Sequence, residues 1–225
     1  MIRVELAKLD LVTNIPVNQF HATGLRGSVG NLEMLVNRSE FHHHKDEKLV
    51  YSHPKIQYRV ENGMFHMVGI QEGAFLLKAL PPIEKLEIYN QVYFTQNHTN
   101  SLVESIGLDE FIYEYKIITP WIALNQDNVK VYRTLKTRNE RNEFLGKKLI
   151  GNLLSFSKTI QYEVPDTITI QGNFYEYGKA YSNDIKLGLI GFLGTFETNF
   201  KLPLFGWGLG KWSSRGYGIV RERQV

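Results

Sequence analysis

Residues 205–220 read FGWGLGKWSSRGYGIV and are the most informative stretch of the 225-residue chain. Two glycine–apolar–glycine triplets, beginning at Gly208 and Gly216, bracket the five residues 211–215. Glycine accepts positive φ angles and close approach to a ligand, so the amides here could face phosphate oxygens while Lys211 and Arg215 supply positive charge. Glycines also suit ordinary hairpins, and the spacing fits neither the dinucleotide fingerprint nor the P-loop. The stretch therefore predicts either an anion-binding loop or a glycine-rich hairpin.

Two tryptophans add a second chemical feature to this stretch. Trp207 and Trp212 offer flat surfaces on which nucleic-acid bases could stack. Together with the basic side chains, they favour a single-stranded nucleic acid as the ligand of the loop.

Positive charge is concentrated in the second half of the chain, although the net charge is only +3. Residues 133–148 hold six basic and two acidic side chains, and residues 201–225 hold five basic and one acidic. This distribution is expected if one face meets a polyanion. A solvated helix face with a basic tail would produce the same pattern.

The composition excludes several classes of protein. The chain has no cysteine, which excludes disulfides, thiolate nucleophiles and cysteine-based metal sites. The longest apolar run, residues 187–196, is about half of the roughly 20 residues that a membrane span requires. The first ten residues, MIRVELAKLD, contain no apolar signal core. We therefore expect a soluble, cytoplasmic protein without a membrane partner.

Hydrophobic periodicity predicts two passes of similar element order. In the first half we expect a strand, a helix, two strands, a helix and a strand, at residues 2–11, 25–36, 56–60, 64–70, 73–80 and 86–94. In the second half we expect a strand, a long helix with a Thr137/Glu140 capping box and three further strands, at residues 111–122, 137–156, 167–181, 185–200 and 217–221. The second helix of this half is missing or vestigial.

This order predicts an α+β protein made of two tandem ferredoxin-like (RRM-like) domains with antiparallel sheets. The N-terminal domain is expected at residues 1–100 and the C-terminal domain, which carries the glycine-rich loop, at residues 101–225. The boundary falls somewhere in residues 96–109.

The glycine pattern and this architecture together resemble the RAMP superfamily. The closest resemblance is to the CRISPR-associated endoribonucleases that cut repeat RNA into guide RNA. The resemblance covers nearly the whole chain. It implies a metal-independent, cofactor-free enzyme in which the ribose 2′-hydroxyl attacks the phosphodiester, leaving a 2′,3′-cyclic phosphate and a 5′-hydroxyl. CRISPR repeat RNA is then the expected partner, with a homodimer or effector-complex subunits as further partners.

The resemblance directs attention to the histidines that follow the first helix. His42, His43 and His44 lie where this family commonly keeps its catalytic histidines, and imidazole is the side chain that titrates near neutral pH. In an extended segment His42 and His44 project to the same side, so we expect these two to be catalytic. A subgroup with two nearby histidines also has a downstream tyrosine, for which Tyr51 is the match. A solvated loop or a zinc or nickel site are the alternatives for the triplet.

Other residues are candidates for holding the RNA backbone. Arg26 opens the first helix, Lys45 and Lys48 follow the histidines, and Arg138, Lys147 and Lys148 form a basic ridge on the long helix. The remaining candidates lie in the C-terminal loop and are Gly208, Gly210, Lys211, Trp212, Arg215, Gly216 and Gly218.

The fold alone does not establish an enzyme. The same superfamily contains subunits that only hold RNA within an effector complex, and a general RNA-binding protein would share many of these features. Incubation with repeat RNA separates the three hypotheses.

Overall fold

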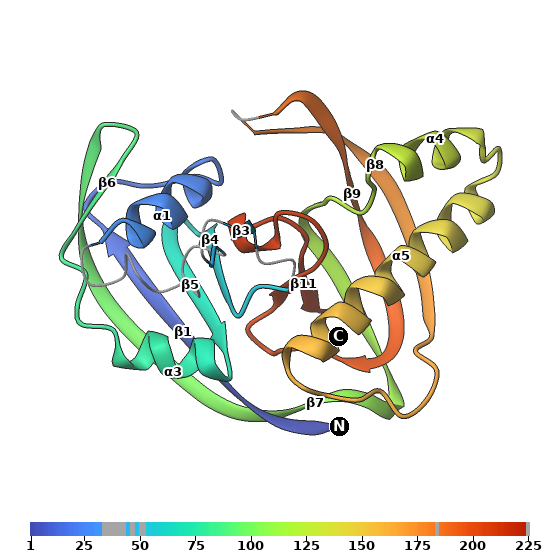
Figure 1. The fold of residues 1–225 in the computed structure, drawn as a ribbon, viewed down its shortest axis with the longest axis horizontal. Coiled ribbons are helices and arrows are strands. Elements are labelled where there is room, and N and C mark those ends of the chain that lie inside the picture. Colours follow the sequence, from blue (N-terminus) through green and yellow to red (C-terminus); the bar gives the residue numbers. More distant parts are fainter. Residues whose placement is uncertain (33–43, 46–47, 50–52, 183–184, 224–225) are drawn as a thin grey trace. The chain divides into compact units, whose positions relative to one another are not determined.

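The computed structural model describes residues 1–32, 44–45, 48–49, 53–182 and 185–223, which divide into two compact units (Figure 1). The N-terminal unit comprises Arg3–Glu104 together with Ser214–Gly216. The C-terminal unit comprises Met1–Ile2, Ser105–Ser213 and Tyr217–Val225. Each unit takes in a few residues from a distant part of the chain. Among the described residues, no helix is long and apolar enough to cross a membrane.

The N-terminal unit has the strand–helix–strand–strand–helix–strand order of a ferredoxin-like fold. Its elements are β1 Ile2–Thr13, α1 His21–Gly30, β4 Ile56–Glu61, β5 Met64–Ile70, α3 Glu72–Ala79, β6 Lys85–Ile88 and the first part of β7 Gln91–Trp121. The strands lie in the order β7–β1–β5–β4, and β6 pairs with β7. A separate two-stranded ladder joins β2 His44–Lys45 to β3 Lys48–Leu49. The order and the antiparallel pairing confirm the predicted fold of this half.

One face of this sheet forms the main core of the N-terminal unit. Alternate residues of β1 point to it, among them Leu9 and Leu11, and they pack with residues of β4 and β5. Leu25 of α1 and Leu77 of α3 belong to the same cluster, so both helices cover this face (Figure 1). The period of two in the strands and the apolar stripe of α1 are what the sequence predicted.

Two turns of this unit differ in how clearly the sequence marks them. Asn62 and Gly63 adopt φ angles of 50° and 73° between β4 and β5, which confirms the predicted hairpin. The strand expected at residues 86–94 is wrong, because the chain reverses at Tyr89 and Asn90 with φ angles of 52° and 63°. Neither residue is glycine, so the usual turn signal is absent.

Helix α1 begins earlier than the periodicity predicted. The side chain of Asn18 accepts a hydrogen bond from the Phe20 amide at 3.1 Å, and the Asn18 carbonyl accepts one from the His21 amide at 2.9 Å. Asparagine is a favoured residue for starting a helix in this way. The part of the predicted helix beyond Leu32 lies outside the described residues.

The opposite face of the N-terminal sheet carries a buried row of charged and polar side chains. Asp10, His66 and Arg59 are opposite one another on β1, β5 and β4. The Nδ1 of His66 lies 2.6 Å from Asp10 Oδ1, and its Nε2 lies 3.1 Å from the Glu61 carbonyl oxygen. Both partner atoms are hydrogen-bond acceptors.

Asp10 is the titratable group whose pKa this row perturbs most clearly. Burial favours its neutral form, but hydrogen bonds and charges from His66 and Lys8 outweigh burial and lower the pKa below 3.8. A carboxylate with a lowered pKa stabilises the folded protein above its unfolded pKa, and this stabilisation is lost as the pH falls through its folded pKa.

We predict that Asp10→Asn lowers the free energy of unfolding at neutral pH by about 1 kcal/mol, because an amide cannot replace the charged partner of His66. The difference from the unchanged protein should be smaller at about pH 3, below the ordinary aspartate pKa of about 3.9, because the stabilisation is lost as the pH falls from there through the lowered folded pKa. Urea unfolding followed by circular dichroism at both pH values measures this. The exposed Glu84 gives a matched control as Glu84→Gln, and an equal loss for Asp10→Asn at both pH values would contradict the assignment.

The C-terminal unit repeats the same fold with two changes, a short helix added before the long one and a 3₁₀ turn in place of the second helix. Its elements are the second part of β7, α4 Gln126–Thr134, α5 Arg138–Thr159, β8 Ile170–Ser182, β9 Ile185–Lys201, β10 Trp207–Gly208, η1 Ser213–Arg215 and β11 Ile219–Glu222. The strands lie in the order β8–β9–β7–β11–β10. A three-residue 3₁₀ turn, η1, stands where a second helix would be, in agreement with the expected vestigial helix. The fold is therefore two tandem ferredoxin-like units.

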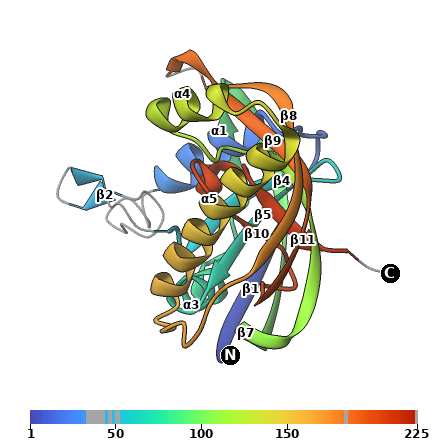
Figure 2. The same ribbon diagram turned by 90° about the vertical axis from the view of Figure 1, so that its right-hand side faces the viewer.

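Helix α5 packs along β8, and its Phe156 contacts Phe200 of β9, which closes the core of this unit (Figure 2). Phe156 of α5 lies with its ring centroid 6.4 Å from that of Phe200 and 5.7 Å from that of Trp207. Thr137 and Glu140 form the predicted capping box at the start of the helix. Helix α4 was not predicted, because it is mostly polar, although Asn125 caps it by accepting from the Asn128 amide.

Candidate functional site

The glycine-rich stretch forms a loop between β10 and β11 that is closed by backbone hydrogen bonds within the C-terminal unit. The Leu209 amide donates to the Gly218 carbonyl at 2.9 Å, and the Gly218 amide donates to the Pro120 carbonyl at 3.0 Å. The Lys211 amide donates to the Ile122 carbonyl at 3.1 Å. These three amides serve the structure of the loop, so they do not supply the phosphate-facing donors that the sequence suggested.

Glycine is required at Gly218 by close packing. Its φ angle is +65°, and a Cβ atom there would lie 2.1 Å from the carbonyl oxygen of Leu209. Both the left-handed backbone and the contact with a backbone atom exclude a larger residue.

We predict that Gly218→Ala lowers the free energy of unfolding of the C-terminal unit by about 3 kcal/mol, from backbone strain and the clash together. Gly151 in α5 is the matched control, because a Cβ there meets nothing within 4 Å. Gly151→Ala should stabilise the unit by about 0.5–1 kcal/mol. Urea unfolding followed by tryptophan fluorescence measures both, and a neutral Gly218→Ala would contradict the structural role.

The tip of the loop presents a cation and an aromatic ring. Lys211 is exposed, and its Nζ lies 5.8 Å from the ring centroid of the half-exposed Trp212. The Trp212 ring packs edge-on against Tyr217, with the centroids 5.4 Å apart. This packing holds the indole in place, which leaves it suited to stacking on a base.

Trp207 is not accessible for stacking on a base. Its side chain is fully buried and packs against Phe156, so the stacking role expected for it is wrong. Alternation along β10 could have indicated an inward position, but a two-residue strand is too short to show a period.

Residues Ser214–Gly216 belong to the N-terminal unit, where they lie against α1 and β4. The Gly216 carbonyl accepts a hydrogen bond from Gln19 Nε2 at 2.9 Å. A Cβ on Gly216 would lie 3.1 Å from the Tyr58 carbonyl oxygen and 3.4 Å from the Ala22 Cβ. The segment is thus packed tightly enough to position Arg215.

Arg215 and Arg26 form a pair of like charges in this unit. Burial lowers the pKa of Arg26, and the positive charge of Arg215 lowers it further. Burial raises the pKa of Tyr58, which is fully buried near Arg26. Repulsion between the two guanidinium groups would be offset by an anion bound to both, and phosphate matches guanidinium geometry well. The structure thus brings together two of the residues predicted to bind RNA.

The structure describes only part of the segment that holds the predicted catalytic residues. His42 and Tyr51 lie outside the described residues. The backbone of His44 and Lys45 pairs with that of Leu49 and Lys48 as an antiparallel ladder, and the side chains of these residues are outside the description. His44 therefore has the extended backbone on which its prediction depended, while its catalytic role stays a prediction.

The basic ridge on α5 is partly engaged in structural contacts. Arg138 Nη2 donates to Asn173 Oδ1 at 2.6 Å, and Lys148 Nζ lies 4.8 Å from the Phe144 ring centroid. Lys147 is exposed. The ridge stays a candidate contact for the RNA backbone.

Within the described residues, no group of three or more His, Asp or Glu side chains is arranged to hold a metal ion. Two of the three consecutive histidines, His42 and His43, lie outside the described residues.

Comparisons with known proteins agree with this architecture. The family model of the Cas6b N-terminal domain matches residues 2–104, and that of the Cas6b C-terminal domain matches residues 107–223. An uncharacterised protein of Methanocaldococcus jannaschii is 34% identical over 139 residues, which are 61% of this chain and 92% of that protein.

Solved structures show the same similarity in three dimensions. A crystal structure of Cas6b matches with a TM-score of 0.87 at 27% identity, over 99% of this chain and 100% of the other. A crystal structure of the CRISPR RNA processing endoribonuclease Cas6b matches with a TM-score of 0.74 at 25% identity, with the same coverage. A type IV CRISPR-Cas crRNA endonuclease, at 12% identity and a TM-score of 0.53, shares the fold.

Proposed function

Because the chain belongs to the Cas6b family, we propose that it is an endoribonuclease that cleaves CRISPR repeat RNA to produce guide RNA. The observation that carries the proposal is the match of the chain to both Cas6b family models, over residues 2–104 and 107–223. Arg26 and Arg215 are candidates for a shared phosphate contact, since the charge of Arg215 lowers the pKa of Arg26.

Cleavage requires a nucleophile, a base and an acid. The ribose 2′-oxygen attacks phosphorus while one imidazole of the His42/His44 pair removes the 2′-hydroxyl proton. The bond between phosphorus and the 5′-oxygen breaks, and the other imidazole, in its protonated form, donates a proton to that oxygen. The products are a 2′,3′-cyclic phosphate and a 5′-hydroxyl. The step consumes no water and needs no metal ion.

The remaining candidates would bind and orient the RNA. The hydroxyl of Tyr51 donates to a phosphate oxygen at the scissile position, and Lys45 and Lys48 offset the negative charge that builds up in the transition state. Lys211 and the ridge on α5 contact phosphates further along the strand, and Trp212 stacks on a base.

Incubation of the purified protein with its CRISPR repeat RNA tests the proposal. We expect one discrete cut, a product with a 2′,3′-cyclic phosphate, and an unchanged rate in excess chelator. Binding without cleavage would favour the non-catalytic RNA-holding subunit, and loss of cleavage in chelator would favour metal-dependent chemistry at the histidines.

A further inference from the structure

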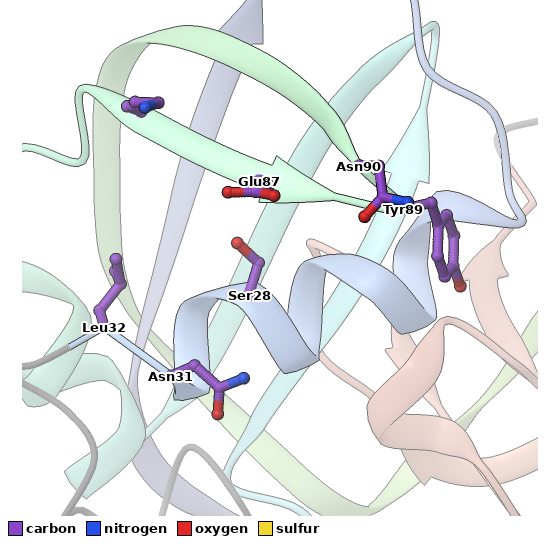
Figure 3. Close-up of a pocket in the computed structure, with 7 residues that line it drawn as sticks. Ser28, Asn31, Leu32, Glu87, Tyr89 and Asn90 are labelled. Carbon is purple, nitrogen blue, oxygen red and sulfur yellow. The ribbon is translucent and has the colours of Figure 1, made fainter.

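A pocket of about 510 Å³ lies beside α1 in the N-terminal unit, within the range typical of small-ligand sites. It is lined by the last turn of α1 and by the β6–β7 hairpin (Figure 3). Its lining includes Ser28, Asn31 and Leu32 from the helix side and Glu87, Tyr89 and Asn90 from the hairpin. Lys85 of β6 completes the lining. None of these residues has a role in the function proposed above.

Tyr89, one of the lining residues, carries an aromatic ring that packs beside the first turns of α1 (Figure 3). Tyr89 is 58% exposed, but its hydroxyl donates to the Phe20 carbonyl at 3.4 Å and its ring lies 6.2 Å from that of His21. Gly24 allows this approach, because a Cβ there would lie 3.2 Å from the Tyr89 ring. The ring is therefore positioned before any ligand arrives.

Tyr89 and Asn90 are the two central residues of the tight hairpin turn that joins β6 to β7. Tyr89 and Asn90 both have positive φ angles, where glycine or asparagine is the usual choice and an aromatic residue is unfavourable. Strain of this kind often persists where it serves a functional site. Asparagine or glycine at position 89 would relieve it but would remove the ring from the pocket.

The remaining lining supplies hydrogen-bonding groups. Glu87 is exposed on the outer side of β6, and Ser28 points from the helix toward it (Figure 3). The side-chain amides of Asn31 and Asn90 can both donate and accept. An ionised carboxylate only accepts, so Glu87 selects a ligand that presents N–H donors.

We propose that this pocket binds one unpaired guanine base of the RNA, an inference that rests on the proposed function. Single-stranded RNA is recognised by stacking of bases on aromatic rings and by hydrogen bonds to their Watson–Crick edges. Guanine presents two adjacent N–H donors on that edge, and these match the two oxygens of Glu87. Adenine, cytosine and uracil each place an acceptor beside their donor, which a carboxylate repels. The Tyr89 ring supplies the stacking surface, and Lys85 lies where it can meet the carbonyl oxygen of the base or a neighbouring phosphate.

Titration of the full chain with free nucleotides, followed by NMR of the side-chain amides, tests this proposal without requiring RNA cleavage. We expect guanosine monophosphate to shift the Asn31 and Asn90 amide signals in a saturable way. Inosine monophosphate, which lacks the second donor, and adenosine monophosphate should bind about fivefold more weakly or worse. Glu87→Gln should abolish this preference, and Glu84→Gln, which removes an exposed carboxylate outside the pocket, should leave it unchanged.

Equal binding of the three nucleotides, or a guanine preference that persists in Glu87→Gln, would overturn the proposal. Cleavage of repeat RNA by the same preparations is measured in parallel. Cleavage without a guanine preference refutes the pocket assignment alone. A guanine preference without cleavage refutes the proposed function and leaves the pocket assignment standing.

Discussion

His42→Ala and His44→Ala are each expected to slow single-turnover cleavage of repeat RNA by about 10²- to 10⁴-fold, the usual contribution of a general acid or base. The affinity for RNA should change little, because the imidazoles act on protons in the transition state rather than on the phosphate charges of the bound strand. Quenched-flow cleavage and filter binding on the same preparations measure the two quantities separately.

His43→Ala is the matched control for these variants. Side chains of an extended chain alternate between its two faces, so the proposed arrangement requires His43 to point away from the face that His42 and His44 share. Its replacement should leave the cleavage rate nearly unchanged. A full rate in the His42/His44 double variant would reject the assignment, and a loss for His43→Ala as large as for its neighbours would reject the extended arrangement.

Replacing Arg26 or Arg215 by glutamine is expected to weaken RNA binding by about tenfold each, since hydrogen bonds to charged groups contribute about 1.5–3 kcal/mol. The slope of log affinity against log salt concentration should also become shallower by about 0.7 for each lost phosphate contact. Fluorescence anisotropy over a range of salt concentrations measures both effects. Arg3→Gln, at an exposed position of the same unit, should change both quantities only slightly.

The unbound protein gives an independent test of the same pair. The charge of Arg215 disfavours the charged form of Arg26, so Arg215→Gln removes a repulsion and should not destabilise the N-terminal unit. Weaker RNA binding with unchanged or higher stability identifies an anion site. Weaker binding that accompanies a loss of stability would instead assign Arg215 to the packing of the loop.

Much of the fold could be predicted from local patterns. Asn62 and Gly63 indicate the β4–β5 hairpin, and Thr137 and Glu140 indicate the start of α5. Both features could be predicted because each depends on residues within four positions of one another in the sequence. The turn at Tyr89 and Asn90 was not predicted, because the local sequence does not mark it. Asn90 accepts a positive φ angle, but Tyr89 is not a residue that favours one, so the pair lacks the usual turn signal.

The sequence indicated which types of residue belong to the candidate site, but it did not indicate which of them lie close together. Arg26 and Arg215 are 189 positions apart in the chain, and nothing local to either one indicates that they lie in the same unit. Trp207 and Trp212 look equivalent in the sequence, yet the structure buries the first and leaves the second half-exposed at the tip of the loop. Burial depends on contacts with Phe156, which a sequence pattern does not record.

The membership of Ser214–Gly216 in the N-terminal unit limits how this protein can be recombined with its relatives. A gene fusion that joins residues 1–104 to the second half of a homologue would also exchange the carbonyl that Gln19 binds and the arginine beside Arg26. In such a hybrid, residues 214–216 come from the homologue and do not match the first half that they contact, even when each half folds. The two halves are therefore expected to be inherited as one block, and grafts that carry residues 214–216 with the first half should be the ones that keep RNA binding.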